Sequence, residues 1–187
     1  MSAFFLAFLS CLGMTFAGRE QVLVARLSGR LGQGRGLLVL VWLSSIGTSA
    51  LAAWLAKSMT PLLVPTARQL FVGFALGLAG LDLLLGRQRR LPVEPTRSLG
   101  AIGLVLFTGQ LTDSARFLIL ALSVLTGAPF WVASGGIIGS GAALTVAWMA
   151  GEFWEKRLPL RVFQYVAGGL FLLASVMVLL FAKGLVD

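Results

Sequence analysis

Two short polar clusters interrupt otherwise apolar stretches of this sequence, and both contain charged side chains. The first runs from Thr15 to Gln21 and the second from Gly109 to Arg116. Asp113 is the residue best suited to chemistry, because a charge near the centre of a bilayer costs roughly 2.5–3.5 kcal/mol on insertion scales and usually serves a function. A carboxylate there can take up a cation or a proton. We therefore predict that Asp113 binds an ion, beside Gln110 on the same helix, and is the one candidate metal ligand.

Neutral oxygen donors accompany Asp113 in its own cluster and in the other one. Carboxylate, hydroxyl and amide oxygens together suit hard cations such as calcium or manganese. The further residues predicted to bind substrate or ion are Gln110, Thr112, Ser114, Thr15 and Gln21.

Three charged residues are candidate charge partners at these clusters. Arg116 follows Asp113 by three positions, so the two would share a helical face. The sequence leaves open whether they form a purely structural ion pair or whether Asp113 caps a half-helix. Arg19 and Glu20 are adjacent and are interpreted as a surface pair near the inner membrane interface.

One more carboxylate lies within an apolar run. Asp82 is close to Gly86 and is expected to reach toward Arg87 or Arg89 at the inner interface rather than to act in transport.

The composition requires lipid as the solvent for these elements. Hydrophobic residues make up 58% of the 187 residues, charged residues 12%, and the mean hydropathy is +0.94. A soluble domain carries about a quarter charged residues, and a small core cannot hide such an apolar excess. The chain is therefore predicted to be an all-α integral membrane protein.

Six apolar runs are long enough to be membrane spans of about 20 residues each. They cover approximately residues 2–27, 36–56, 69–85, 99–125, 130–150 and 162–185. The first and fourth runs contain the polar clusters and are long for one span. Either long tilted helices or helices broken at the cluster would fit them.

The two halves of the chain match at a nearly constant offset of about 95 residues. The matched pairs are Thr15 with Gln110, Ser28 with Ser123, Trp54 with Trp148, Pro65 with Pro159, Gln69 with Gln164 and Gly73 with Gly168. An odd number of spans per copy inverts the second copy in the membrane, which is a recurrent transporter architecture. We predict a single transmembrane domain over residues 1–187, with six helices as two inverted three-helix repeats: repeat one about 2–86, a connecting loop about 87–98, and repeat two about 99–185.

The basic residues predict the orientation. With the N-terminus outside, most arginines fall in the inside loops, so the positive-inside rule places both termini outside the cytoplasm. The net charge of +8 is then explained by topology and anionic lipid, and no nucleic-acid partner is expected.

The sequence lacks the residues that several classes of protein need for their function. It contains no histidine, one cysteine (Cys11), and no phosphate loop or nucleophile–base pair. We expect no enzyme and no bound cofactor. The spacings Gly73–Gly77 and Gly135–Gly139 predict close helix packing.

At the two polar clusters the chain resembles the Gdt-type family of calcium/manganese–proton exchangers, within the lysine-exporter-like superfamily. Each repeat of that family carries the motif E-x-G-D-(K/R)-(S/T), usually followed by Q. In the second cluster the motif's first acid falls on Gln110 and its aspartate on Asp113. In the first cluster these positions are Thr15 and Gly18. The basic position and the trailing glutamine are kept there as Arg19 and Gln21.

The resemblance implies a divergent member of the family, acting as a secondary transporter that exchanges a divalent cation for protons in a bacterial inner membrane. Its partners would be membrane lipid, a small cation or solute, and protons, with a homo-oligomer left open. Two alternatives remain on the same scaffold. One is an exporter of another small solute, suggested by Arg19 and Arg116, and the other is a non-transporting membrane scaffold protein.

Overall fold

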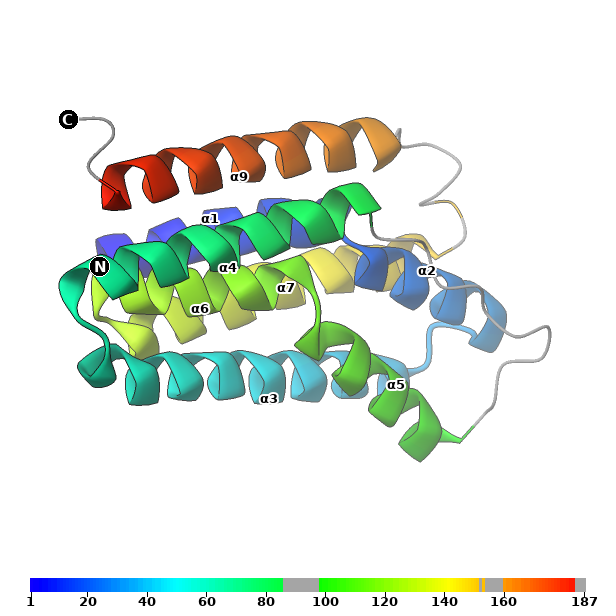
Figure 1. Ribbon diagram of the computed structural model, residues 1–187. Coiled ribbons are helices and arrows are strands. Elements are labelled where there is room, and N and C mark those ends of the chain that lie inside the picture. The colour runs from blue at the N-terminus through cyan, green and yellow to red at the C-terminus, as the bar shows by residue number, and fades with distance from the viewer. Residues whose placement is uncertain (86–97, 152, 154–159, 184–187) are drawn as a thin grey trace.

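The computed structural model describes residues 1–85, 98–151, 153 and 160–183, and within these residues the chain is helical with no strand (Figure 1). The sequence also predicts a solvated, charged helix end at Glu152 and Glu155, and this segment lies outside the described residues. The elements, in chain order, are α1 (Ser2–Ala17), α2 (Arg19–Leu31), α3 (Arg35–Met59), the 3₁₀ turn η1 (Thr60–Leu62), α4 (Pro65–Leu85), α5 (Leu99–Leu111), α6 (Ser114–Thr126), α7 (Pro129–Ala150) and α9 (Leu160–Ala182).

The first and fourth apolar runs are broken helices and not long tilted ones. α1 and α2 meet at an angle of 60°, and α5 and α6 meet at 50°. Gly18 between the first pair is extended, with φ −74° and ψ 158°, and Asp113 between the second pair is extended in the same way. Asp113 also occupies the N-cap position of α6, for which aspartate is a preferred residue. Each polar cluster therefore marks a break in the helix.

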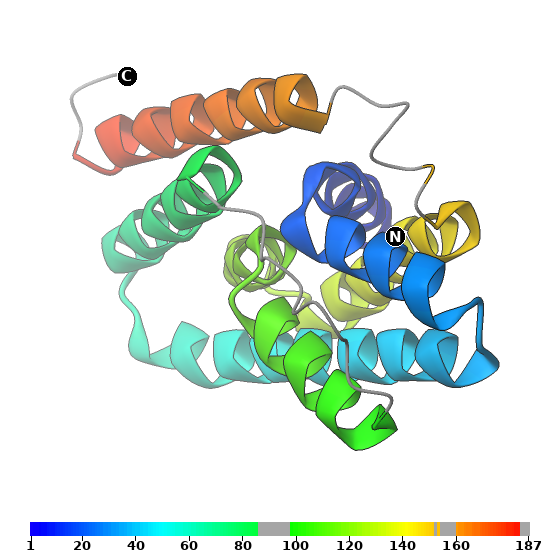
Figure 2. The same ribbon diagram turned by 90° about the vertical axis from the view of Figure 1, so that its right-hand side faces the viewer.

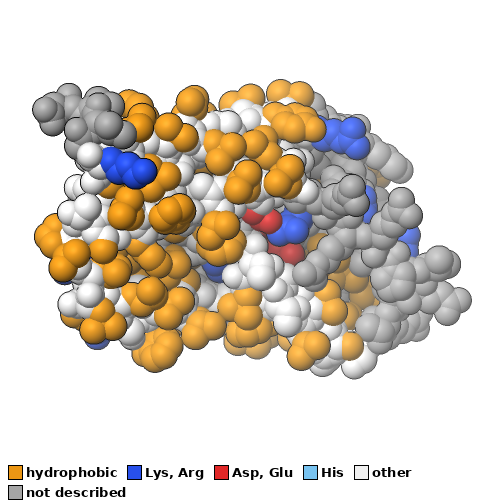
Figure 3. All heavy atoms as spheres, in the orientation of Figure 1, with side chains coloured by type: hydrophobic (Ala, Val, Ile, Leu, Met, Phe, Trp, Pro, Cys, Tyr) orange, Lys and Arg blue, Asp and Glu red, His pale blue; other side chains and the backbone are white. Residues whose placement is uncertain are grey.

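The number of long apolar helices agrees with a membrane protein. The segments Arg35–Leu62, Pro65–Leu85, Pro129–Ala150 and Arg161–Ala182 are each long and apolar enough to cross a bilayer, and the total rises to six if each bent pair is one span. Apolar side chains cover most of the face seen in Figure 3, as expected for a surface in contact with lipid. The prediction of an all-helical integral membrane protein is confirmed.

The helices form a bundle in which α1, α6 and α7 lie between α3 on one side and the pair α4 and α9 on the other (Figures 1 and 2). The start of α1 and the end of α9 lie at the same end of the bundle. The turn between α2 and α3 and the start of α5 lie at the opposite end (Figure 1).

Contacts between the two halves are reciprocal at the offset found in the sequence. The Ser175 hydroxyl donates to the Gly73 carbonyl at 2.7 Å, and a Cβ added at Gly80 would lie 2.9 Å from the Gly168 carbonyl oxygen. Gly168 is the counterpart of Gly73 at an offset of 95, and Ser175 is the counterpart of Gly80. The two contacts therefore join the same two pairs of corresponding positions. Ser45 and Ser140, themselves 95 residues apart, contact each other through their hydroxyls at 2.8 Å. Such reciprocity is the property of an interface with two-fold symmetry.

Glycines allow the closest helix contacts, as the two GxxxG spacings predicted. Any Cβ added at Gly135 or Gly139 in α7 would overlap the backbone carbonyls of Phe4 and Phe8 in α1. Gly73 and Gly77 in α4 lie as closely against the side chains of Leu179 and Ser175 of α9. The packing prediction for both spacings is confirmed.

We expect Gly135→Ala to destabilise the protein by about 1–3 kcal/mol, because the new methyl group meets backbone that cannot move aside. Gly169→Ala in α9 is the matched control, since a Cβ there has no neighbour within 4 Å. The control should be neutral or slightly stabilising. Thermal unfolding of both variants in detergent checks the prediction, and equal melting temperatures would contradict the close α1–α7 packing.

Candidate functional site

Arg116 is the centre of a buried polar cluster where α5 ends and α6 begins. Only 3% of Arg116 is exposed. Its guanidinium donates to the Gln110 side-chain oxygen at 2.6 Å, to the Thr48 hydroxyl at 2.8 Å and to the Ser45 hydroxyl at 3.3 Å. Through Ser45 the cluster continues to Ser140 on α7. Arg116 therefore ties the two halves of the broken helix to α3, using neutral acceptors only.

Two carboxylates lie at the N-terminus of α6, on either side of Ser114. The Ser114 backbone N–H donates to the Asp82 carboxylate at 3.1 Å, and the Ser114 hydroxyl donates to Asp113 at 3.5 Å. Asp82 also forms an ion pair with Arg19 at the start of α2. Negative charge is favourable at a helix N-terminus, where unpaired backbone N–H groups carry partial positive charge. Figure 3 shows a small charged patch within the apolar surface, and Arg19 and Asp82 are partly exposed.

The first polar cluster is buried against the second. Glu20 is 3% exposed, and its carboxylate packs against Gly109 in the last turn of α5. Gln21 is fully buried and donates from its side-chain nitrogen to the Ala143 carbonyl of α7 at 2.9 Å. The side-chain oxygens of Gln21 and Thr15 are buried and have no hydrogen-bond partner among the described residues. The two polar clusters thus meet in one buried region between the breaks.

The structure brings most of the sequence-predicted site residues into this region. Those that are buried at the breaks are Thr15, Glu20, Gln21, Gln110, Asp113, Ser114 and Arg116. Thr112 differs, because it is exposed and its hydroxyl lies 3.3 Å from the Gly109 carbonyl of its own helix.

Two details of the second cluster differ from what its spacing suggested. Gln110 and Asp113 do not share a helix, because α5 ends at Leu111. Among the described residues Asp113 and Arg116 form no ion pair within 4 Å, since Arg116 bonds to neutral acceptors instead. Asp113 stands at the N-cap position of α6, but its side chain accepts no capping hydrogen bond from that helix.

Two further corrections concern Arg19 and its surroundings. Arg19 and Glu20 are not a surface pair: the chain bends at Gly18, so Arg19 reaches Asp82 while Glu20 is buried against Gly109. Asp82 pairs with Arg19. Arg87 and Arg89, toward which Asp82 was expected to reach, lie outside the described residues, so that expectation stays a prediction.

Sequence reasoning also missed the hydroxyls that complete the cluster. Ser45 and Thr48 lie in α3 and Ser140 lies in α7, all of them buried. The available signal was the offset itself, because Ser45 and Ser140 are 95 residues apart. Hydroxyl side chains are common in helices, so one pair at this spacing does not by itself predict a contact.

The reciprocity of the fold extends to the site. Arg116 of α6 donates to Thr48 of α3, and Gln21 of α2 donates to Ala143 of α7. Each residue of the second contact lies 95 positions before or after its counterpart in the first. Gln21 and Arg116, which are 95 residues apart, therefore make corresponding contacts near the two breaks, and one of them is neutral while the other is charged.

The described residues contain no group of three or more His, Cys, Asp or Glu side chains that could hold a metal ion. Asp113 has oxygen donors around it but no set of carboxylates converging on one point. Any cation at this site would be bound by one or two carboxylates together with neutral oxygens.

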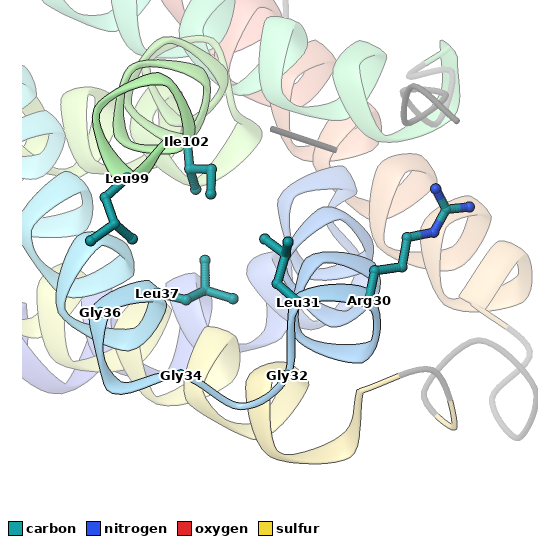
Figure 4. A pocket seen from close by; sticks show the side chains of 8 residues that line it. All are labelled: Arg30, Leu31, Gly32, Gly34, Gly36, Leu37, Leu99 and Ile102. Carbon is teal, nitrogen blue, oxygen red and sulfur yellow. The ribbon is translucent and has the colours of Figure 1, made fainter. Parts of the chain in front are cut away.

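Of two cavities, one lies at the site and the other at an end of the bundle. One of about 130 Å³ reaches the buried cluster and is lined by Arg116 and Thr48 together with apolar side chains of α3, α5 and α6. A larger one of about 460 Å³ opens at the turn between α2 and α3 and the start of α5 (Figure 4). In Figure 4 Leu31, Leu37, Leu99 and Ile102 surround this second cavity and Arg30 points away from it. Among the described residues, no carboxylate lines this cavity.

Comparison with known proteins gives one match. Residues 98–185 match the model of the family described as "Divalent cation/proton antiporter GDT1". No curated protein and no solved structure matches the chain. The matched segment includes α5, α6, α7 and α9, and with them the Gln110–Arg116 cluster. This match confirms the family resemblance at the second polar cluster, while the first cluster lies outside the matched residues.

Proposed function

We propose that the protein is a secondary transporter that exchanges a cation for protons, because residues 98–185 match the Gdt-type family of divalent cation/proton antiporters. The observation that carries the proposal is the buried carboxylate of Asp113 at the break between α5 and α6. Transporters commonly bind ions where a spanning helix is interrupted, because the free helix ends face the ion. A carboxylate at that point can hold a proton or a cation in turn.

The two breaks form the proposed transport site, with one contribution from each repeat. Asp113, Ser114 and Gln110 come from the second repeat, and Thr15 and Gln21 come from the first. Asp82 and Glu20 supply further negative charge beside them. The reciprocal contacts at an offset of 95 support a two-fold relation between repeat one, about residues 2–86, and repeat two, about 99–185. We propose that the axis lies in the membrane plane, so that the repeats are inverted.

An exporter of anionic or zwitterionic solutes is less well supported by the geometry. That alternative needs guanidinium groups able to receive a substrate. Arg19 is paired with Asp82, and Arg116 is held by Gln110, Thr48 and Ser45. Both arginines are thus held chiefly by acceptors of the protein itself, and only Arg19 Nε and Arg116 Nη1 are buried without a partner among the described residues. This favours a cation as the substrate.

The orientation proposed from the arginine distribution gives a test of topology. Both termini would lie outside the cytoplasm of a bacterial inner membrane. Reporter fusions after Gly34 and after Glu94 should both report a cytoplasmic position, and a fusion after Val64 should report an external one. An external signal after Gly34 or Glu94 would contradict the six-span orientation.

The function itself is tested with the full chain in proteoliposomes that contain a pH-sensitive dye. Addition of a transported cation outside should move protons, and vesicles without protein should show no such change. Salts of sodium, potassium, lithium, calcium and manganese are added in turn. A protein that is folded and inserted but moves no protons in response to any of them would contradict the proposed function.

A further inference from the structure

We propose that a cavity between the end of α3 and the turn that joins α6 to α7 binds an anionic phospholipid, with the lipid phosphate at Lys57. The inference does not depend on the proposed function, because none of the residues at the two helix breaks lines this cavity. It names a binding site and the chemical class of its ligand.

The cavity has a volume of about 610 Å³, which lies within the range of ligand pockets in proteins. The end of α3 and the turn between α6 and α7 lie at the same end of the bundle as the start of α1 (Figure 1). The cavity is lined from α3 by Ala50, Ala53, Trp54 and Lys57, and from the turn and the start of α7 by residues 127–131 and Ala133.

The cavity lies at the depth expected for lipid headgroups. Lys57 is in the last turn of α3 and directly follows the apolar run predicted at 36–56, and Pro129 begins α7. Tryptophan is enriched at the membrane–water interface, and lysine side chains near the ends of spans extend toward the headgroups. Trp54 is 62% exposed and Trp131 is 49% exposed. The cavity therefore combines an apolar wall with the residue types that contact the headgroup region.

Three hydrogen-bond donors at the cavity have no partner in the protein. Within the described ranges, the Lys57 ammonium group forms no ion pair, and no hydrogen bond holds it or the indole N–H of Trp54 or Trp131. No aspartate or glutamate among the described residues lines the cavity. A phosphate group carries negative charge and several acceptor oxygens, so it is complementary to one ammonium group and two N–H groups. The apolar lining can contact the first part of the acyl chains.

The charge of the cavity favours an anionic lipid over two other occupants. The choline group of a zwitterionic lipid carries its own positive charge, so such a lipid would leave the charge of Lys57 uncompensated. A second copy of this chain in a two-fold dimer would present the same surface, because the same patch of both subunits forms such an interface. Lys57 of one subunit would then lie near Lys57 of the other, and like charges repel.

The test measures lipid binding to the purified full chain in detergent by native mass spectrometry. The probes are phosphatidylglycerol and phosphatidylcholine with identical acyl chains. The wild type should bind phosphatidylglycerol about fivefold more tightly, which is the effect of one basic residue near anionic lipid. Lys57→Gln should lose this preference and stay folded, since Lys57 is exposed. Lys183→Gln is the matched control, because it removes the same charge just after α9, outside the cavity, and should keep the preference.

A further variant distinguishes the cavity from a simple surface charge. Trp54→Ala keeps Lys57 but removes one wall of the cavity, so it should weaken the binding of both lipids. Unchanged binding by Trp54→Ala would overturn the inference, and so would equal binding of the two lipids by the wild type. An equal loss of preference in Lys57→Gln and Lys183→Gln would overturn it as well. A dimer in detergent that dissociates in Lys57→Gln would identify a second copy as the occupant and contradict the proposal.

Discussion

Replacing Asp113 by asparagine is expected to abolish cation-driven proton movement while leaving the protein folded. The asparagine side chain would keep the shape of the aspartate but could neither hold an exchangeable proton nor balance a cation. Asparagine is as good an N-cap as aspartate, so α6 should still begin at Ser114. Arg116 would not be stranded, because it is held by Gln110, Thr48 and Ser45.

The measurement for Asp113→Asn is flux in proteoliposomes together with thermal unfolding in detergent. We expect no flux and a melting temperature within about 2 °C of the wild type. Thr108→Val is the matched control on α5, since Thr108 is exposed and its hydroxyl bonds only within its own helix. Normal flux in Asp113→Asn would remove Asp113 from the transport site. A large loss of stability would indicate a structural role instead.

Breaking the ion pair between Arg19 and Asp82 is expected to have the largest effect on stability. This pair joins the start of α2 to α4, and Asp82 also accepts from the Ser114 backbone at the start of α6. The two side chains are 23% and 14% exposed, so the pair is largely removed from solvent. Asp82→Asn leaves the Arg19 charge without its partner, which should cost roughly 3 kcal/mol and lower the melting temperature by several degrees.

A double-mutant cycle distinguishes loss of the pair from loss of either residue alone. Arg19→Gln combined with Asp82→Asn removes both charges and should recover much of the stability that Asp82→Asn loses. Arg68→Gln is the control for removal of an arginine, because Arg68 is exposed and its Nε donates to the nearby Leu63 carbonyl. Strictly additive effects of Arg19→Gln and Asp82→Asn would show that the pair contributes nothing.

The sequence predicts the helices of this protein well because lipid imposes a simple pattern. Apolar runs of about 20 residues are spans. The run predicted at 36–56 lies within α3 (Arg35–Met59), and the run predicted at 130–150 nearly coincides with α7 (Pro129–Ala150). The positions of the two helix breaks could be predicted, but the bend at each break could not. Thr112, Asp113 and Gly18 signal an interruption, but whether a long run tilts or bends depends on what its neighbours can satisfy.

The partners of the charged residues could not be predicted from spacing alone. Spacing of three within one helix suggested that Asp113 pairs with Arg116, yet the helix is broken between Gln110 and Ser114, so the rule did not apply. Asp82 and Arg19 are 63 residues apart and meet only because α4 packs beside the two breaks. The offset of 95 was the better guide, since it relates Gln21 to Arg116 and Ser45 to Ser140 before any contact is known.

The most direct test of the exchange mechanism is proton release on cation binding to the solubilised protein. The full chain is titrated in weakly buffered detergent solution with the cation that drives flux in vesicles, and a pH indicator follows the protons. The account predicts that the wild type releases protons as the cation binds, and that Asp113→Asn releases none. Cation binding detected by calorimetry without proton release, or equal release from wild type and Asp113→Asn, would contradict it.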